Sequence, residues 1–401
     1  MRILHAAISA EGATLGREKE VATLAVAQKA RGSDVMIAID RPGIFTESCL
    51  ECGVPVVVCD RLAVCGQLQG LLKRLVTPEE VGALENAMQG FVECVESFGP
   101  DIIHCHGSGA EALVAIGAGN RLGVPCAFTS AGPSIAVSGW KSGLRFGVLC
   151  SAVHFGELLE SEIPDANVYC VPNGTRAVPP KQVQQTGTGH SPSLTVAGSL
   201  AAKKGIDVLI LAMLELRRRL GRACPLLNIY GDGPRKKYLT EMVAVLELND
   251  VVQFHGFKLG ILEDCPNSDI LVLPSRFEGS PLVVLEAMSR GMPIVATDVG
   301  EVANMLPDWR YGHVVPKDAV MPLADAIELL LQDIADGRFN PDLLIERHRS
   351  LYSIEKFAER TEAAYRQILL NNSATAQQPP GSPGIPPRAT TSASQFPPRR
   401  F

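Results

Sequence analysis

Residues 269–300 of this chain combine a short apolar strand, a glycine loop and the start of a helix with two carboxylates. Ser280 is placed as the N-cap of that helix and Pro281 as its first residue, where no N–H group is needed. The backbone amides of Leu282 and Val283 are then expected to be free at the positive end of the helix dipole. A helix start of this kind binds anions, phosphate groups in particular. We therefore predict a phosphate site here.

Two glutamates flank the predicted phosphate site. Glu286 lies about 9 Å from the helix start at the standard helical rise, a distance that suits a ribose whose diphosphate rests on the helix tip. Glu278 lies in the loop before the helix and is placed for the group beyond the phosphates. Gly279 lets a ligand approach the backbone closely. Each glutamate taken alone has a second interpretation, as a favourable partner of the helix dipole.

The segment as a whole resembles a known family. Its PS, EG, P, EAM, G-x-P and T-x-x-G elements, together with the spacing of Glu278 and Glu286, are similar to the Glu-x7-Glu signature of the retaining nucleotide-sugar glycosyltransferases of family 4. The resemblance covers nearly everything from Met1 to about Leu370. It implies the GT-B fold, with Glu278 facing the donor sugar and Glu286 holding the ribose hydroxyls.

The donor site implied by the resemblance includes a cation. Lys204, in the sequence VAGSLAAKKG, falls on the lysine of a family motif, and its compact charge suits a diphosphate. Ser199 occupies a donor position where the family normally has arginine, whose bidentate contacts serine cannot supply. Lys203 and Arg276 are candidates to compensate. Without the motif, a lysine in a loop would be interpreted as a solvated charge.

Two more loops belong to the implied donor site. The sequence YGDGP, at the end of a strand, matches the family's G-x-G element and places Gly231 and Gly233 near the nucleotide. Taken alone, an Asp-Gly pair also indicates an ordinary turn. Residues 255–258 (HGFK) follow the next strand, where the resemblance implies contact with the base.

The first half of the chain should supply the acceptor side. Gly16 and Glu18 carry over from the family's glycine loop, with Gly16 near the donor phosphates and Glu18 near the acceptor. His106 ends the strand expected at residues 101–106, and the two-residue period of a strand places His104 on the same face. A metal pair is one interpretation, but no third ligand lies at a suggestive spacing. A histidine that contacts acceptor hydroxyls is the other.

Two positions depart from the family. In the sequence VPCAFTSAG, Thr129 and Gly132 match a T-x-H-G element whose histidine approaches the transferred sugar, but Ala131 replaces that histidine. Arg176, after an Asn-Gly turn, stands where the family prefers aspartate. Because alanine can neither hydrogen-bond nor titrate, the change at Ala131 bears directly on catalysis.

The composition narrows the classes of partner. A chain of 401 residues can form two full domains. Its net charge of −6 argues against nucleic acid as a partner. Eleven cysteines with no signal peptide indicate reduced thiols in the cytoplasm. Cys49 and Cys52, followed by Cys59 and Cys65, leave a structural zinc site as an alternative to core or loop thiols.

Strand and helix signals alternate along the chain, which indicates an α/β fold with parallel sheets. We predict two doubly wound Rossmann-like domains facing a cleft, at residues 1–178 and 193–352, joined by a linker at 179–192. Residues 353–370 form a final helix that, by the resemblance, crosses back to the first domain, and the Pro-rich residues 371–401 form a disordered tail. Strands are expected at 2–8, 34–39, 54–59, 101–106, 124–129, 168–171, 194–197, 226–230, 251–255, 270–273 and 293–296, and other helices at 18–30, 81–98, 110–121, 206–220, 235–246, 282–290 and 322–332.

The resemblance implies transfer of a sugar from a nucleoside-diphosphate sugar to a glycan or lipid-linked acceptor, with retention of anomeric configuration. Lys204, Glu278 and His106 are the predicted catalytic residues. The helix start and Lys204 would stabilise charge on the leaving diphosphate, so neither a cofactor nor a metal ion is expected. A non-catalytic nucleotide-sugar-binding or scaffold protein, favoured by Ser199 and Ala131, and a sugar-nucleotide epimerase are the alternatives.

Peripheral contact with the inner face of a membrane is a further hypothesis. The sequence contains no run of about 18 apolar residues, so no membrane-spanning helix is predicted. Residues 140–149 (WKSGLRFGVL) and 71–75 (LLKRL) do mix basic and apolar side chains, as interfacial segments do. Ordinary domain surface is the other interpretation of both segments.

Overall fold

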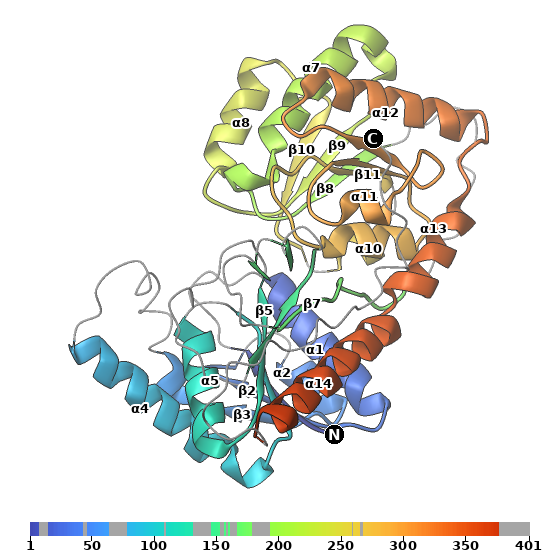
Figure 1. The fold of residues 1–401 in the computed structure, drawn as a ribbon. Helices are drawn as coiled ribbons and strands as arrows, with labels where there is room; N and C mark the ends of the chain where they lie inside the picture. Colours follow the sequence, from blue (N-terminus) through green and yellow to red (C-terminus); the bar gives the residue numbers. More distant parts are fainter. Residues whose placement is uncertain are drawn as a thin grey trace.

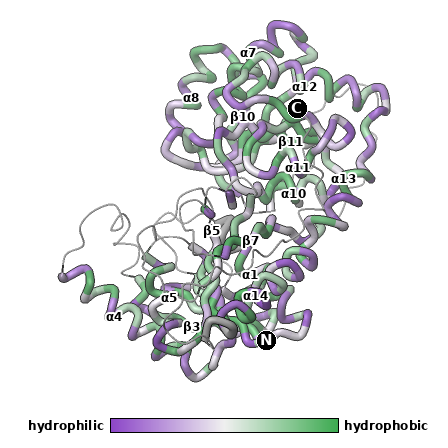
Figure 2. The backbone as a smooth tube through the Cα atoms, in the orientation of Figure 1, coloured by the Kyte–Doolittle hydropathy of each residue, from purple (hydrophilic) through white to green (hydrophobic). Residues whose placement is uncertain are grey.

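Two parallel sheets organise this chain in a computed structural model (Figure 1). Helices cover both faces of each sheet, and each face has its own buried apolar cluster. Figure 2 shows that the chain is apolar along strands such as β11, whereas outer helices such as α8 mix polar and apolar residues. The structure describes residues 1–7, 15–42, 46–63, 78–107, 110–130, 146–152, 156–157, 159–160, 167–178, 193–258, 260–264 and 268–376.

The first sheet has seven parallel strands in the order β3-β2-β1-β4-β5-β6-β7. Apolar runs such as IIHC and FGVLC are buried on both faces, as expected for central strands of a parallel sheet. The strands are β1 (Arg2–Ala7), β2 (Asp34–Ile39), β3 (Val56–Val58), β4 (Ile102–Cys105), β5 (Cys126–Ser130), β6 (Phe146–Cys150) and β7 (Asn167–Cys170). The helices are α1 (Leu15–Ala30), α2 (Thr46–Glu51), α4 (Pro78–Val95) and α5 (Ala110–Leu122), with 3-10 turns η1 (Asp60–Ala63) and η3 (Glu96–Phe98).

The second sheet has six parallel strands in the order β10-β9-β8-β11-β12-β13. Its strands are β8 (Ser193–Ala197), β9 (Leu227–Tyr230), β10 (Val252–Gly256), β11 (Ser268–Leu273), β12 (Ile294–Thr297) and β13 (His313–Val315). Its helices are α7 (Ile206–Leu220), α8 (Lys236–Val245), α9 (Ile261–Asp264), α10 (Leu282–Ser289), α11 (Val302–Met305), α12 (Val320–Ala335) and α13 (Pro341–Arg347), with short turns η4 (Ala202–Lys204), η5 (Gly221–Ala223) and η6 (His348–Tyr352). The predicted fold class of two doubly wound α/β units is confirmed.

Strand order determines where ligands can bind. In each sheet the order reverses once, between β1 and β4 in the first sheet and between β8 and β11 in the second. Ligands of doubly wound folds bind outside the carboxyl ends of the strands at such a reversal. The loops after β8 and β11 are the ones that carry most of the predicted donor residues, and His106 directly follows β4.

The last helix, α14 (Ile354–Ala376), returns to the first sheet, as the resemblance implies. Phe357, Tyr365 and Ile368 pack into the same apolar cluster as Ile3. Figure 1 shows the helix lying along the first domain. It continues six residues past the predicted end at residue 370. The longer helix has a physical reason, because the Asn371 and Asn372 side chains donate hydrogen bonds to the Tyr169 hydroxyl (3.4 Å) and the Ile368 carbonyl (2.8 Å).

One hypothesis about the surface is wrong. Residues 146–149, considered as part of an interfacial segment, belong to strand β6, where Val148 and Leu149 are buried in the first domain. The rest of that segment, residues 71–75, the linker at 179–192 and the tail from 377 lie outside the described residues. Within the part of the chain that the structure describes, no helix is both long and apolar enough to cross a membrane.

Candidate functional site

The loops after β8 and β11 bring two predicted residues together. The Lys204 ammonium lies 2.6 Å from Glu278 Oε1, and both side chains are mostly buried. The Ser275 hydroxyl donates to the same carboxylate oxygen at 2.8 Å. Ser275 was not predicted from the sequence, although a hydroxyl three residues before Glu278 on the same loop is close enough to contact it. The three residues form a compact polar group at the reversal point of the second sheet.

Close backbone packing holds the two loops in place. Gly205 has φ +62°, and a β-carbon added there would overlap the carbonyl oxygen of Pro274. The Arg276 amide donates to the Lys203 carbonyl at 2.8 Å. Only glycine allows this approach without strain. The glycine after Lys204 therefore sets the distance between Lys204 and the loop that carries Glu278.

The helix next to this group begins where the predicted range 282–290 begins, but its N-cap differs from the one expected. Helix α10 begins at Leu282, and Pro281, in an extended conformation, is its N-cap. Leu282 and Val283 therefore form the first turn, where amides have no carbonyl four residues earlier within the helix. Ser280 is not the N-cap. Its hydroxyl and its carbonyl instead accept hydrogen bonds from the backbone amide (3.2 Å) and the side chain (3.1 Å) of Asn173, from the segment that follows β7.

Glu286 lies in the second turn of α10 and is half-buried. Its place, four residues after the first helical residue, agrees with the spacing used to predict it. The Ser289 hydroxyl donates to the Glu286 carbonyl at 2.7 Å, which helps to close the end of this short helix. The helix and the turn predicted for Glu286 therefore agree with the structure.

The β12–α11 loop, which was not predicted to take part in the site, packs against the backbone of Glu278 and Gly279. Gly300 has φ +55°, and a β-carbon there would overlap the Gly279 carbonyl oxygen and lie 2.6 Å from that of Glu278. The next amide, of Glu301, donates to the Gly279 carbonyl at 2.8 Å. In the sequence, Gly300 stands out only as the last residue of the T-x-x-G element. The structure shows that this glycine allows the β12–α11 loop to pack under the donor loop.

The predicted glycines of the G-x-G element serve the same purpose. A β-carbon at Gly231 would overlap the Gly198 carbonyl oxygen, and one at Gly233 would lie 2.7 Å from the Leu200 amide nitrogen. The Leu200 amide donates to the Asp232 carbonyl at 2.9 Å. The loops after β8 and β9 therefore pack backbone to backbone, at the edge of the sheet where the nucleotide is expected.

Two arginines near Ser199 are already engaged. Arg276 makes a two-pronged contact with Asp207, at 2.8 and 3.0 Å, and Arg235 approaches the same carboxylate at 3.3 Å. Although burial opposes the charge, the hydrogen bonds and charge of Arg276, helped by Arg235, hold the pKa of Asp207 below its usual value. Lys203 is exposed. Arg276 was a candidate to replace the missing arginine. Its guanidinium is instead held by Asp207, where it supports the loop.

An aromatic pair lies beside the G-x-G loop. The rings of Tyr230 and His255 stack with centroids 4.6 Å apart and planes inclined by 15°. Asn228 Oδ1 lies 2.8 Å from His255 Nε2 and fixes the orientation of the ring. The three side chains come from β9 and the carboxyl half of β10. Tyr230 was not singled out from the sequence, because the pairing depends on the alignment of two strands.

The helix that carries Gly16 and Glu18 begins earlier than predicted. It starts at Leu15 rather than at Glu18, so Gly16 lies in the first turn of α1 and not in the preceding loop. Leu15 and Arg17 are good helix formers, and the added turn forms despite Gly16. Arg176 is exposed. Ala131, which replaces the family histidine, lies outside the described residues.

His106 turns into the core of the first domain. Its ring lies 4.0 Å from that of His104, which confirms that the two share a face, and its Nε2 is 2.8 Å from His5 Nδ1. His106 is 2% exposed, so an acceptor hydroxyl would reach it only after a rearrangement. No third ligand stands at a suggestive spacing in the sequence, but the fold brings His5 to the pair. Parallel pairing of β1 with β4 places His5 directly opposite His104.

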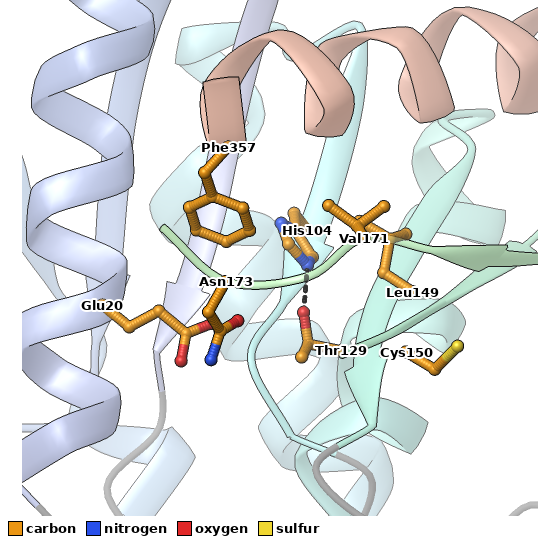
Figure 3. Close-up of a pocket in the computed structure, with 8 residues that line it drawn as sticks. All are labelled: Glu20, His104, Thr129, Leu149, Cys150, Val171, Asn173 and Phe357. Atoms are coloured by element: carbon orange, nitrogen blue, oxygen red, sulfur yellow. Dashed lines mark hydrogen bonds between the residues drawn. The ribbon is translucent and has the colours of Figure 1, made fainter. Parts of the chain in front are cut away.

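A pocket reaches this region from one side (Figure 3). His104 and Thr129 line it, and their side chains are joined by a hydrogen bond of 2.8 Å. Glu20 of α1 and Asn173 form the opposite wall, and Phe357 of α14 closes the top of the view. The pocket therefore lies between His104 and Asn173, the residue that contacts Ser280.

The cysteines considered for zinc do not gather in the structure. Cys49 is buried and Cys52 exposed, and burial raises the pKa of the Cys49 thiol to about 11. Burial also raises the pKa of Cys59, whose hydrogen-bonding neighbour is Cys94. Among the described residues, the group able to share a metal ion is the histidine trio, which contains none of these thiols. Cys65 lies outside the described residues.

Two family models match this chain. Residues 191–333 match the model described as glycosyl transferases group 1, and residues 16–154 match a glycosyl transferase 4-like domain. Together the two matches cover well over half of the sequence. The first includes every predicted donor residue except Gly16, and the second includes the predicted acceptor residues.

Known proteins with similar sequences or structures agree with these matches. The chain is 33% identical over 189 residues to the alpha-D-kanosaminyltransferase of Streptomyces kanamyceticus (46% of this chain, 48% of that protein). It is 29% identical over 220 residues to a phosphatidylinositol N-acetylglucosaminyltransferase component from Arabidopsis thaliana (53% and 46%). The chain thus spans about half the length of these relatives. The Anabaena protein Alr3699/HepE, solved with UDP-glucose, superposes with a TM-score of 0.68 at 16% identity over 93% of this chain and 100% of that one.

Proposed function

This chain belongs to the glycosyl transferases group 1 family, and from that premise we propose that it transfers a sugar from a nucleoside-diphosphate sugar to a glycan or lipid-linked acceptor, with retention at the anomeric carbon. The observation that carries the proposal is the Lys204–Glu278 pair beside the start of α10. A cation, a carboxylate and a helix start in one place suit a phosphorylated sugar.

We propose a part for each group. The Lys204 ammonium has three donor hydrogens, so it can bind Glu278 and a phosphate oxygen together. The Leu282 and Val283 amides at the tip of α10 add the positive end of the helix dipole. As the bond to the leaving diphosphate breaks, both stabilise the charge that develops there. Ser275 and Lys204 both bind Glu278 Oε1, and we assign the other oxygen, Oε2, to a sugar hydroxyl.

The remaining donor contacts follow from position. Glu286, in the second turn of α10, is the proposed partner of the ribose hydroxyls. The stacked pair Tyr230 and His255 lies at the edge of the sheet next to the G-x-G loop, and we propose that the base binds there. Binding of UDP-glucose by the Anabaena protein supports a uridine donor. With Lys204 and the helix start supplying positive charge, we propose that no cofactor or metal ion takes part in transfer.

The acceptor and the place of action are proposed more broadly. The names of the two relatives indicate that one transfers kanosamine and that the other transfers N-acetylglucosamine to a phosphatidylinositol. The second name supports a lipid-linked acceptor. We also propose a glycan acceptor, as in polysaccharide or lipopolysaccharide biosynthesis. We propose that the protein works in the cytoplasm, with peripheral contact with a membrane if its acceptor is a lipid.

A non-catalytic sugar-nucleotide binder is the second candidate. It is favoured by the commitment of Arg276 and Arg235 to Asp207, because those two arginines cannot then compensate for Ser199 at the diphosphate. Calorimetry with UDP-, GDP- and ADP-linked sugars, followed by NMR of products formed with simple glycan acceptors, separates the two. Turnover with retained configuration supports the enzyme, and tight binding without turnover supports the second candidate. If no sugar nucleotide binds, both are excluded.

A further inference from the structure

Three buried histidines meet at the reversal point of the first sheet. His5 lies on β1, and His104 and His106 lie on or directly after β4. One nitrogen of each ring lies within 4.8 Å of the corresponding nitrogens of the other two. The rings are 0%, 1% and 2% exposed. Three imidazoles this close in the core need a reason, because each has polar nitrogens that must be satisfied.

Polar side chains outside the trio contact two of the rings, and the contact to His5 fixes the position of its hydrogen. His5 Nε2 lies 2.7 Å from Gln28 Oε1, an oxygen that can only accept, so this nitrogen carries the hydrogen and Nδ1 keeps its lone pair. The Tyr365 hydroxyl lies 2.6 Å from His104 Nδ1, and His104 Nε2 lies 2.8 Å from the Thr129 hydroxyl. If the phenol donates, His104 also presents a lone pair at Nδ1. An outer hydrogen-bond partner that sets the tautomer is typical of histidines that bind metal.

The contacts inside the group are short. His5 Nδ1 lies 2.8 Å from His106 Nε2, and the Tyr365 hydroxyl lies 2.6 Å from His104 Nδ1. Because His5 donates outward from Nε2 to Gln28, its Nδ1 lone pair faces His106 and can bind a metal ion.

We propose that His5, His104 and His106 hold a divalent transition-metal ion such as zinc, with the Tyr365 hydroxyl as the fourth ligand. Zinc–nitrogen bonds of about 2.0–2.1 Å in a tetrahedral site place two ligand nitrogens about 3.4 Å apart. His5 Nδ1 and His106 Nε2 must therefore separate by about half an ångström, and the hydrogen on His106 Nε2 must move to Nδ1 of the same ring. The Tyr365 hydroxyl and His104 Nδ1, 2.6 Å apart, must separate as well, and the phenol proton is released to solvent when the oxygen binds the ion. All four proposed ligands come from the first sheet and α14.

The ion would have a structural effect distinct from sugar transfer. His5 and the other two histidines belong to neighbouring strands, whereas Tyr365 belongs to α14, the helix that returns from the second domain. Coordination would thus fasten α14 to the first sheet. The pocket of Figure 3 reaches His104 past Glu20 and Asn173 and provides a route for the ion.

Metal titration of the full-length chain tests the proposal. The protein is prepared without a histidine tag, stripped with a chelator, and titrated with Co²⁺ and Zn²⁺. We expect one equivalent of each to bind, visible absorption typical of tetrahedral cobalt, and a thermal midpoint that rises with metal concentration. The near-ultraviolet thiolate-to-cobalt band should be absent, because no ligand is a cysteine. A strong thiolate band, or no stoichiometric uptake, overturns the proposal.

Variants locate the ion. His104→Phe removes one ligand and should abolish uptake of one equivalent. Tyr365→Phe keeps the ring in the core and should weaken Co²⁺ binding about 10-fold or more, the usual scale for losing a supporting group. His255→Gln, at an exposed histidine of the second domain, is the matched control and should bind like the unchanged protein. If His104→Phe does not fold, Tyr365→Phe decides. Affinity equal to that of the unchanged protein in the folded variants overturns the proposal.

Discussion

At the level of single residues, Lys204 and Glu278 determine how the proposed donor site holds its charge. The lysine side chain is 22% exposed and the carboxylate 13%, so each depends on the other for solvation. Breaking a partly buried pair leaves one charge uncompensated, and this costs more than the pair itself contributes. Without the lysine, the Glu278 charge would also repel the diphosphate that is expected at the start of α10.

Replacing Lys204 by alanine should therefore lower both binding and turnover. Loss of one group that stabilises transition-state charge typically reduces kcat by about 10²–10³-fold, and sugar-nucleotide affinity should fall as well. Lys237→Ala, at a fully exposed lysine on α8, is the matched control. Steady-state kinetics and calorimetry with the best donor measure the two effects. A Lys204→Ala variant with unchanged kcat and affinity would contradict the assignment.

Ser199 offers the opposite experiment. It lies half-buried in the loop after β8, where the family's arginine would contact the diphosphate, and Arg276 and Arg235 are held by Asp207. Ser199→Arg should tighten nucleoside-diphosphate binding about 10-fold, as one charge-assisted contact does. Ser199→Gln, of similar reach but without charge, should leave the dissociation constant unchanged. Equal affinity of the Arg variant and the unchanged protein would show that the loop does not face the diphosphate.

Residue positions were predictable where a motif fixes them and not where the fold joins distant segments. Glu278 and Glu286 follow from spacing along one stretch of chain, and Lys204 follows from the family motif in VAGSLAAKKG. The use of Ser280 does not, because its partner, Asn173, is 107 residues away. His5 escaped notice for the same reason, since only the register of β1 against β4 brings it to His104.

At the level of elements, the donor site depends on loops packed against each other. The β12–α11 loop lies directly under Glu278 and Gly279, and the glycine at its tip makes this contact possible. The Glu301 amide ties the two loops together through the Gly279 carbonyl. A substitution in the β12–α11 loop should therefore alter the donor site, even though this loop holds none of the proposed donor contacts.

Gly300→Ala should displace the Glu278 loop and lower activity strongly. Its added methyl group overlaps the Gly279 carbonyl oxygen, in addition to the cost of placing alanine at φ +55°. Gly337→Ala is the matched control, with φ +67° and no atom within 4 Å of the added group. Both variants should lose about 1 kcal/mol of unfolding free energy from the backbone. Gly300→Ala alone should lose more stability and raise KM for the donor; equal effects would contradict the packing argument.

Elements were predictable where periodic signals are long. Helices such as α7 (Ile206–Leu220) have the predicted bounds, and β2 (Asp34–Ile39) does too. Strand β6 was missed because its five residues follow a basic stretch and resemble one end of an interfacial segment. Strand β13, with only three residues, has too little sequence for a period of two to be recognised.

At the level of the whole molecule, a short segment and the last helix join the two domains. The Thr175 amide donates to the Tyr352 carbonyl and the Thr175 carbonyl accepts from the Ile354 amide, both at 3.0 Å. The Thr175 hydroxyl lies 2.9 Å from Nε2 of the buried His348. This join lies two residues from Asn173, which contacts Ser280 at the donor helix. The doubly wound domains could be predicted from the alternating pattern of the sequence. These hydrogen bonds between domains could not, because they join residues far apart along the chain.

Buried neutral histidines predict how stability changes with pH in the metal-free protein. Burial lowers the pKa of His5 and of His348 to about 4 and that of His104 further, whereas the unfolded chain titrates near 6.5. Between these values the unfolded chain binds more protons than the native one, so the free energy of unfolding falls as the pH falls. Each histidine contributes up to about 1.4 kcal/mol per pH unit. The lowered pKa of Asp207 acts only below its ordinary value near 3.9, outside this window.

Urea unfolding with a chelator present, from about pH 7 to about pH 4.5, measures this slope. The native protein should lose stability steadily below about pH 6.5, and His348→Gln should show a shallower slope because one of the titrating groups is gone. The hydrogen bond from Thr175 can then be made by the glutamine amide oxygen, so the native fold keeps its domain join. His255→Gln, at an exposed ring, should retain the full slope. Stability that stays constant from neutral pH to about pH 5 would mean that these histidines are not held neutral by burial.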